Sequence, residues 1–304
     1  MSEPSAGYVP YGPEPWQQRS WDARAAGNFI GGGAGAGLIA FATLAGAQAS
    51  AHAALTLIGL ALIGLGLICV ALELGRPLRA ANVLRNPRTS WMGREAWTSM
   101  LLFPAGLAAA WGAPGFAWIA AALALAFACC QARLLQAAKG IPAWREPRVV
   151  PLLVITALAE GAGLFFAGAP WHGAGTSSLL AALGALVLLR HLAWLAYRRR
   201  LQGFAARGAG IALDRAGRAL ALAGTLAPLA LLAAIPLGVA PGPATPWMAA
   251  AAGIAAAAAG AYMKFTLITG AGFNQGFALA RLPMRTRDLR VSPTGSAVRE
   301  ATDG

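Results

Sequence analysis

Eight stretches of about 20 mostly apolar residues constrain the fold of this chain more than any motif in it. A helix needs a stretch of this length and composition to cross the hydrocarbon core of a bilayer. The hydrophobic share of 58% and the charged share of 12% are also unlike those of an ordinary soluble domain. We therefore predict an all-α integral membrane bundle of eight transmembrane helices, at residues 26–47, 52–72, 96–112, 115–137, 149–168, 177–197, 218–239 and 246–270.

These stretches divide the chain into three parts. Residues 1–25 form a polar N-terminal arm, 26–270 the eight-helix membrane domain and 271–304 a polar C-terminal tail. Prolines inside the stretches predict kinks, because a proline removes one backbone hydrogen bond and leaves a carbonyl that needs another donor. They are Pro104, Pro228 and Pro236.

The glycine-rich start of the membrane domain is a packing surface rather than a phosphate loop. No strand precedes the glycines between residues 26 and 46, and no Lys-Ser or Lys-Thr pair follows them. On a helix, Gly27, Gly31 and Gly35 fall in one ridge and Gly33 and Gly37 in another. Ridges of small residues let the backbones of neighbouring helices approach closely.

The chain has a net charge of +13, and the Lys and Arg residues outside the predicted helices lie on one side of the predicted membrane. The arm, the tail and every second loop carry Lys and Arg, whereas the four loops around 46–51, 112–115, 168–176 and 239–245 carry none. The positive-inside rule then places both termini in the cytoplasm. This distribution argues against nucleic acid. The basic side would receive an acidic partner, or its arginines would only set topology and contact anionic lipids.

Ionisable residues inside the predicted helices are the first candidates for chemistry, because burying them in a membrane is costly. Glu160 lies near the bilayer centre, and Arg190 and Arg133 join it as members of a possible proton path. Two carboxylates near the basic side, Glu73 and Glu95, are candidates for proton handling.

A quinone fits this arrangement, since its carbonyls need hydrogen-bond donors and its reduction takes up protons. The candidate quinone-binding residues are Arg76, Trp91, Arg94, His191 and Lys264. These residues have alternative roles that need no quinone. Arginine and lysine side chains can extend to lipid headgroups, and tryptophan is common at membrane interfaces.

Metal and haem sites find little support in the sequence. The three cysteines, Cys69, Cys129 and Cys130, fall in predicted helices and lack CxxC spacing, so we expect no iron-sulfur cluster in this chain. We also expect no haem, because only His52 and His172 could pair, near the uncharged side.

Two segments, "LGRPLRAANVLRNPRTSWMGREAW" (74–97) and "KGIPAWREP" (139–147), together with the eight stretches and the glycine ridges, resemble the membrane anchors of molybdopterin oxidoreductases. This is the family of the dimethyl-sulfoxide reductase and polysulfide reductase anchors. The segment at 264–285 is similar to a subgroup that contains the anchor of phenylacetyl-CoA:acceptor oxidoreductase.

The resemblance implies a multi-pass, haem-free anchor in the cytoplasmic (inner) membrane of a prokaryote. It would exchange electrons between menaquinone or ubiquinone and a four-cluster iron-sulfur subunit. That subunit would dock on the basic cytoplasmic loops and serve a molybdenum or tungsten catalytic subunit holding the molybdopterin. In the subgroup the direction would be quinone reduction. Glu95 matches a glutamate of the family motif, whereas Glu73 stands where the sulfoxide-reductase branch has a histidine.

Two other classes of function stay open at this point. One is a secondary transporter with its substrate site at Glu160 and the kinked helix that contains Pro228. The other is a membrane tether without a quinone site of its own.

Overall fold

A computed structural model of the chain describes residues 15–73, 82–173, 175–202, 205–237 and 242–274. In this part of the chain every regular element is helical, apart from an isolated β-bridge between Gln17 and Phe273. The longer helices are α1 (Ala23–Leu44), α2 (Ala49–Glu73), α3 (Trp91–Ala110), α4 (Phe116–Gln136), α6 (Val149–Ala167), α8 (Ser177–Leu201), α9 (Arg207–Ala221), α10 (Ala227–Ala234) and α11 (Thr245–Phe265). Two short helices, α5 (Pro142–Arg145) and α7 (Ala169–His172), were not expected from the sequence.

The all-α membrane class is confirmed, while the count of eight spans stays a prediction. Seven described segments are long and apolar enough to cross a membrane: Ala23–Leu44, Ala49–Leu72, Phe116–Gln136, Val149–Ala167, Ser177–Leu201, Arg207–Ala234 and Gly242–Gly270. The predicted third span corresponds to α3, which has 20 residues but is not among the seven. Its first three turns include Arg94, Glu95, Thr98 and Ser99, which lower its hydropathy.

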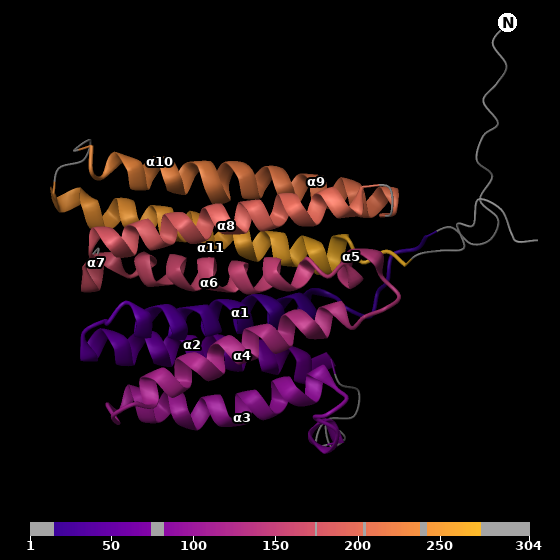
Figure 1. Cartoon of the computed structure of the whole chain (residues 1–304), viewed down its shortest axis with the longest axis horizontal. Coiled ribbons are helices and arrows are strands. Elements are labelled where there is room, and N and C mark those ends of the chain that lie inside the picture. The colour runs from indigo at the N-terminus through magenta and orange to yellow at the C-terminus, as the bar shows by residue number, and fades with distance from the viewer. Residues whose placement is uncertain (1–14, 74–81, 174, 203–204, 238–241, 275–304) are drawn as a thin grey trace, which may run out of the picture. The chain divides into compact units, whose positions relative to one another are not determined.

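The helices form two groups that meet at α1 and α6 (Figure 1). On one side, α2 and α4 pack against α1, and α3 packs against α4. On the other, α11 and α8 pack against α6, and α10 packs against α11. Side chains that lie close together where α1 packs against α6 therefore come from both groups of helices.

The glycine ridges of α1 face two different neighbours, as the sequence predicts. A side chain on Gly31 would lie 2.7 Å from the backbone oxygen of Leu62 in α2, which is too close for a real contact. Gly37 abuts the backbone of α6 at Ala157 and Gly161 in the same way. The missing side chains thus allow α1 to pack closely between α2 and α6.

Two π-helical turns interrupt the helices of the second group. One, Leu222–Leu226, joins α9 to α10 just before Pro228, and the other, Thr266–Gly270, extends α11. The kink predicted at Pro228 coincides with the first turn. Proline lacks the amide hydrogen that the carbonyl of Gly224 would otherwise receive, and Arg190 Nη2 donates to that oxygen at 2.6 Å.

The segment before α1 is attached to the end of the described chain. Gln18 donates its backbone N–H to the oxygen of Gly272 at 2.8 Å, and Trp21 stacks on Trp144 with ring centroids 4.9 Å apart. Asp22 caps α1 by accepting the backbone N–H of Arg24. The Arg24 guanidinium also donates to Asp22 and lowers the pKa of its carboxyl group.

Candidate functional site

A cavity of about 370 Å³ lies among the ends of α1, α2, α3 and α4. We call it the Glu95 cavity. Its wall is mostly apolar, and two polar side chains, Asn28 and Glu95, interrupt it. Both are almost fully buried, with exposed fractions of 2% and 4%. The lining residues are Trp21, Ala25, Asn28, Phe29, Leu67, Val70, Ala71, Val83, Met92, Glu95, Ala96 and Leu134.

The polar groups of this cavity are only partly satisfied within the protein. Asn28 Nδ2 donates to Glu95 Oε1 over a long 3.4 Å, and Gln131 Nε2 donates to the backbone oxygen of Asn28 at 3.0 Å. Asn28 Oδ1 has no hydrogen-bond partner among the described residues. A buried polar atom of this kind normally has a partner, so the cavity offers one amide oxygen and one carboxyl group to a ligand.

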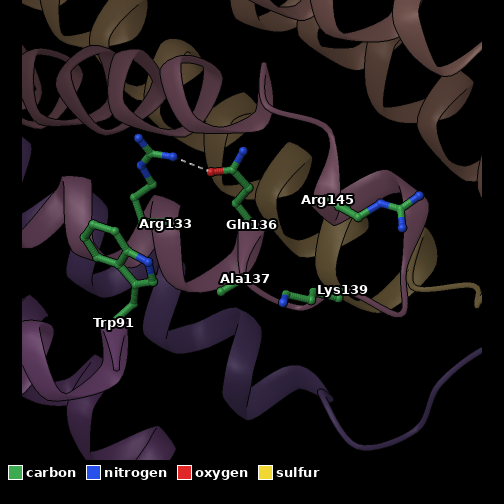
Figure 2. A pocket seen from close by; sticks show the side chains of 6 residues that line it. All are labelled: Trp91, Arg133, Gln136, Ala137, Lys139 and Arg145. Carbon is green, nitrogen blue, oxygen red and sulfur yellow. Dashed lines mark hydrogen bonds between the residues drawn. The ribbon is translucent and has the colours of Figure 1, made fainter. Parts of the chain in front are cut away.

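A basic pocket of about 280 Å³ lies between the start of α3, the end of α4 and the segment that follows α4 (Figure 2). Three cationic side chains, Trp91 and the end of α4 surround it. Arg133 donates to Gln136 at 2.8 Å. The pocket is lined by Trp91, Arg133, Gln136, Ala137, Lys139 and Arg145.

Trp91 and Arg94 belong to this second region and do not line the Glu95 cavity. The guanidinium carbons of Arg94 and Arg133 lie 4.1 Å and 5.7 Å from the centre of the Trp91 ring. Arg94 also donates to the backbone oxygens of Pro87 and Arg88, at 2.9 Å and 2.7 Å. These contacts fix the loop before α3 and place positive charge over the indole face.

The third group is a buried charge cluster of Glu160, Arg190 and Lys264, from α6, α8 and α11. Lys264 Nζ lies 2.6 Å from Glu160 Oε2 and also donates to the backbone oxygen of Phe29 at 2.9 Å. Arg190 donates to the backbone oxygens of Ala256 and Gly224, each at 2.6 Å. All three side chains are at least 98% buried.

The structure therefore separates residues that the sequence analysis grouped together. Lys264, expected at a quinone head group, instead pairs with Glu160. Arg133, expected on a path with Glu160, is exposed in the basic pocket. His191 lines neither cavity, and its Nδ1 lies 3.5 Å from Thr225 Oγ1.

Two of the predicted residues lie at or beyond the edge of the described chain. Glu73 is the last residue of α2, and its side chain is not described. Arg76 lies outside the described residues. The histidines considered for haem each contact the protein: His52 Nε2 lies 3.2 Å from Thr43 Oγ1, and His172 Nε2 lies 3.0 Å from the oxygen of Phe165.

Sequence reasoning missed Asn28 and Gln131, which connect the Glu95 cavity to the rest of the bundle. Both were visible as polar residues in otherwise apolar helical stretches. Neither residue is ionisable, so neither was considered as a site residue, although a buried side-chain amide also needs hydrogen-bond partners.

Comparison with protein families gives one match. Residues 23–167, from the first residue of α1 to the last of α6, match the family model described as DMSO reductase anchor subunit (DmsC). A search of curated proteins gives no match. The matched segment includes α1 to α4, which form both the Glu95 cavity and most of the basic pocket.

Proposed function

Residues 23–167 belong to the DMSO reductase anchor family, and from that premise we propose that this chain binds quinone in the Glu95 cavity. As a membrane-anchor subunit of a molybdopterin oxidoreductase, it assembles with an iron-sulfur subunit and a molybdopterin catalytic subunit. The electrons would pass between the clusters of the docked subunit and the quinone. The proposed direction is quinone reduction, on the cytoplasmic side of the inner membrane.

The observation that carries this proposal is a buried carboxyl group in an apolar cavity. Ligand pockets combine apolar walls with a few polar groups that fix orientation. Phe29, Leu67 and Met92 would contact a quinone ring and the start of its tail, while Asn28 and Glu95 would contact a carbonyl oxygen. A quinone takes up two protons on reduction, and Glu95 is placed to hold one of them at its carboxyl oxygens.

The basic pocket suits the docking of an acidic protein surface. Its cations Arg133, Lys139 and Arg145 are exposed, and no salt bridge to them occurs among the described residues. The pocket and the Glu95 cavity flank the same turns of α3 and α4. A four-cluster iron-sulfur subunit docked there would bring its nearest cluster close to the proposed quinone site.

A transporter is less well supported by the geometry around Glu160. Its carboxylate is paired with Lys264, and the cavity beside Lys264 measures about 10 Å³. That volume accommodates a water molecule rather than a transported solute.

We expect Glu95→Gln to lower electron exchange between the clusters and a quinone analogue at least tenfold, or about 1.4 kcal/mol of activation free energy. The amide keeps the size of the side chain but cannot transfer a proton. The measurement is the exchange rate in the purified complex, with the copurified subunits quantified on a gel. Asp214→Asn is the matched control, because Asp214 is a carboxylate on α9, which does not line the cavity. Unchanged exchange in an intact Glu95→Gln complex would contradict the proposal.

Removing the charges of the basic pocket tests the docking surface separately. The triple change of Arg133, Lys139 and Arg145 to Gln is expected to weaken retention of the iron-sulfur subunit and to make the complex more sensitive to salt. The readout is the amount of iron-sulfur subunit copurified at increasing salt concentration. Changing the exposed Arg199, Arg200 and Arg215 to Gln removes the same charge elsewhere. Equal loss of the subunit in both triple variants would argue against a specific role for the pocket.

A further inference from the structure

A line of buried polar side chains runs from the Glu95 cavity to the buried charge cluster. Glu95 contacts Asn28, and the backbone oxygen of Asn28 accepts from Gln131 on α4. Gln131 in turn lines a second, small cavity together with Lys264, and Lys264 pairs with Glu160. The line crosses α1 near its first turns and ends in the second half of the bundle.

Glycines of α1 provide the space for this line. A side chain on Gly32 would collide with the amide of Gln131, and one on Gly33 would collide with the ammonium group of Lys264. The small cavity between Gln131 and Lys264 has about 10 Å³, and Phe29, Ala128 and Ala157 also line it. This is about the space that one water molecule needs, and amide and ammonium groups are suitable partners for it.

The two ends of the line differ in net charge: the Glu95 end is negative when Glu95 is ionised, and the charge cluster is positive. Glu95 accepts from the neutral amide of Asn28, and no cation pairs with it among the described residues. The charge cluster holds two cations, Lys264 and Arg190, for one carboxylate, Glu160. The helix between the two ends, α1, contributes only Asn28 and the Phe29 carbonyl to this line.

A proton transfer along this line would neutralise both ends. When the proton leaves Lys264 Nζ, the cluster changes from one net positive charge to none, with Arg190 still balancing Glu160. When it reaches Glu95, the carboxylate becomes a neutral carboxylic acid. An unbalanced charge in a buried site is costly, and the transfer removes the charge excess at both ends.

We infer that Lys264 resupplies Glu95 with a proton after each turnover at the Glu95 cavity, an inference that rests on the proposed quinone site. Glu95 gives its carboxyl proton to the bound quinone, whose second proton comes from water. Lys264 replaces the Glu95 proton through water in the small cavity beside Gln131. Lys264 then regains a proton from water. The second carboxylate oxygen of Glu160, Oε1, has no hydrogen-bond partner among the described residues, and the Arg190 guanidinium lies near it beside Gly260.

The test separates the first turnover from the later ones. The purified complex, kept reduced by an excess of reduced methyl viologen, is mixed rapidly with a short-tailed ubiquinone analogue, and quinone reduction is followed in time. In Gln131→Leu and in the double variant Glu160→Met with Lys264→Met, the initial burst is expected to remain. The following steady phase is expected to fall about tenfold or more. A purely structural defect would lower both phases together.

The controls distinguish failure of this inference from failure of the quinone site. Thr43→Val removes a buried hydroxyl group at the opposite end of α1 and should leave both phases unchanged. A normal steady phase in Gln131→Leu, with the burst lost in Glu95→Gln, would overturn the role of Lys264 alone. A normal burst in Glu95→Gln would overturn the quinone site itself. If the double variant fails to assemble, Gln131→Leu decides the question.

Discussion

Replacing Lys264 with methionine is expected to destabilise the folded chain by about 3 kcal/mol, because the buried Glu160 carboxylate and the Phe29 carbonyl both lose their hydrogen-bond donor. Methionine fills a similar volume, so the loss comes from the missing donor rather than from a cavity. Arg190, whose guanidinium lies near Glu160 beside Gly260, offsets part of the loss. The measurement is the free energy of unfolding in detergent, from a denaturant titration.

The double variant Lys264→Met with Glu160→Met tests whether the loss comes from the unpaired Glu160 carboxylate. The double change removes Glu160 together with its donor and leaves the cluster with the same net charge as in the unchanged chain, now carried by Arg190. We therefore expect it to recover much of the stability that the single change removes. Lys139→Met, at an exposed lysine of the basic pocket, controls for the substitution itself. A Lys264→Met protein as stable as the unchanged chain would mean that Glu160 and Lys264 are not paired.

Adding one methyl group at the contact of α1 and α6 is expected to have a comparable effect. The β-carbon of alanine at position 161 would overlap the backbone of Gly37 and Leu38. Backbone atoms cannot move aside as a flexible side chain can, so the helices must separate. We expect Gly161→Ala to cost about 3 kcal/mol, at the upper end of the usual penalty for overpacking.

Gly210→Ala provides the matched comparison, since it makes the same change inside helix α9 with open space around it. There we expect a gain of about 0.4–1 kcal/mol, because alanine restricts the unfolded chain more than glycine does. Thermal unfolding of the two variants side by side gives the comparison. Similar shifts in the two proteins would refute a close approach of α1 to α6.

Much of the fold could be predicted from the sequence, because apolar length determines membrane helices. The glycine spacing on α1 predicted two packing faces, and the structure assigns them to α2 and α6. The position of α3 was harder to predict. The pattern placed its start at residue 96, after Glu95, whereas the helix begins at Trp91 and buries Glu95 in its second turn.

The site was predictable only where its parts are close in sequence. The segment 74–97 pointed to Glu95, and the structure places that residue in an apolar cavity. The pairing of Glu160 with Lys264 joins residues 104 positions apart on helices whose contact no periodicity reveals. Glu160 and Lys264 were therefore assigned separate roles, although a buried anion and a buried cation in one bundle are less costly when they pair.

The π-helical turns at Leu222–Leu226 and Thr266–Gly270 affect how this bundle tolerates changes in chain length. Elsewhere in a helix, deletion of one residue turns all later side chains by about 100°. A π-helical turn already contains one residue more than an α-helical turn, so a deletion there would leave the flanking faces in register. The buried carbonyls of Gly224 and Leu267, which accept from Arg190 and Trp144, would then no longer be available to these side chains. Related chains are thus expected to show single-residue gaps at these two turns, and a chain with such a gap should lack the matching arginine or tryptophan.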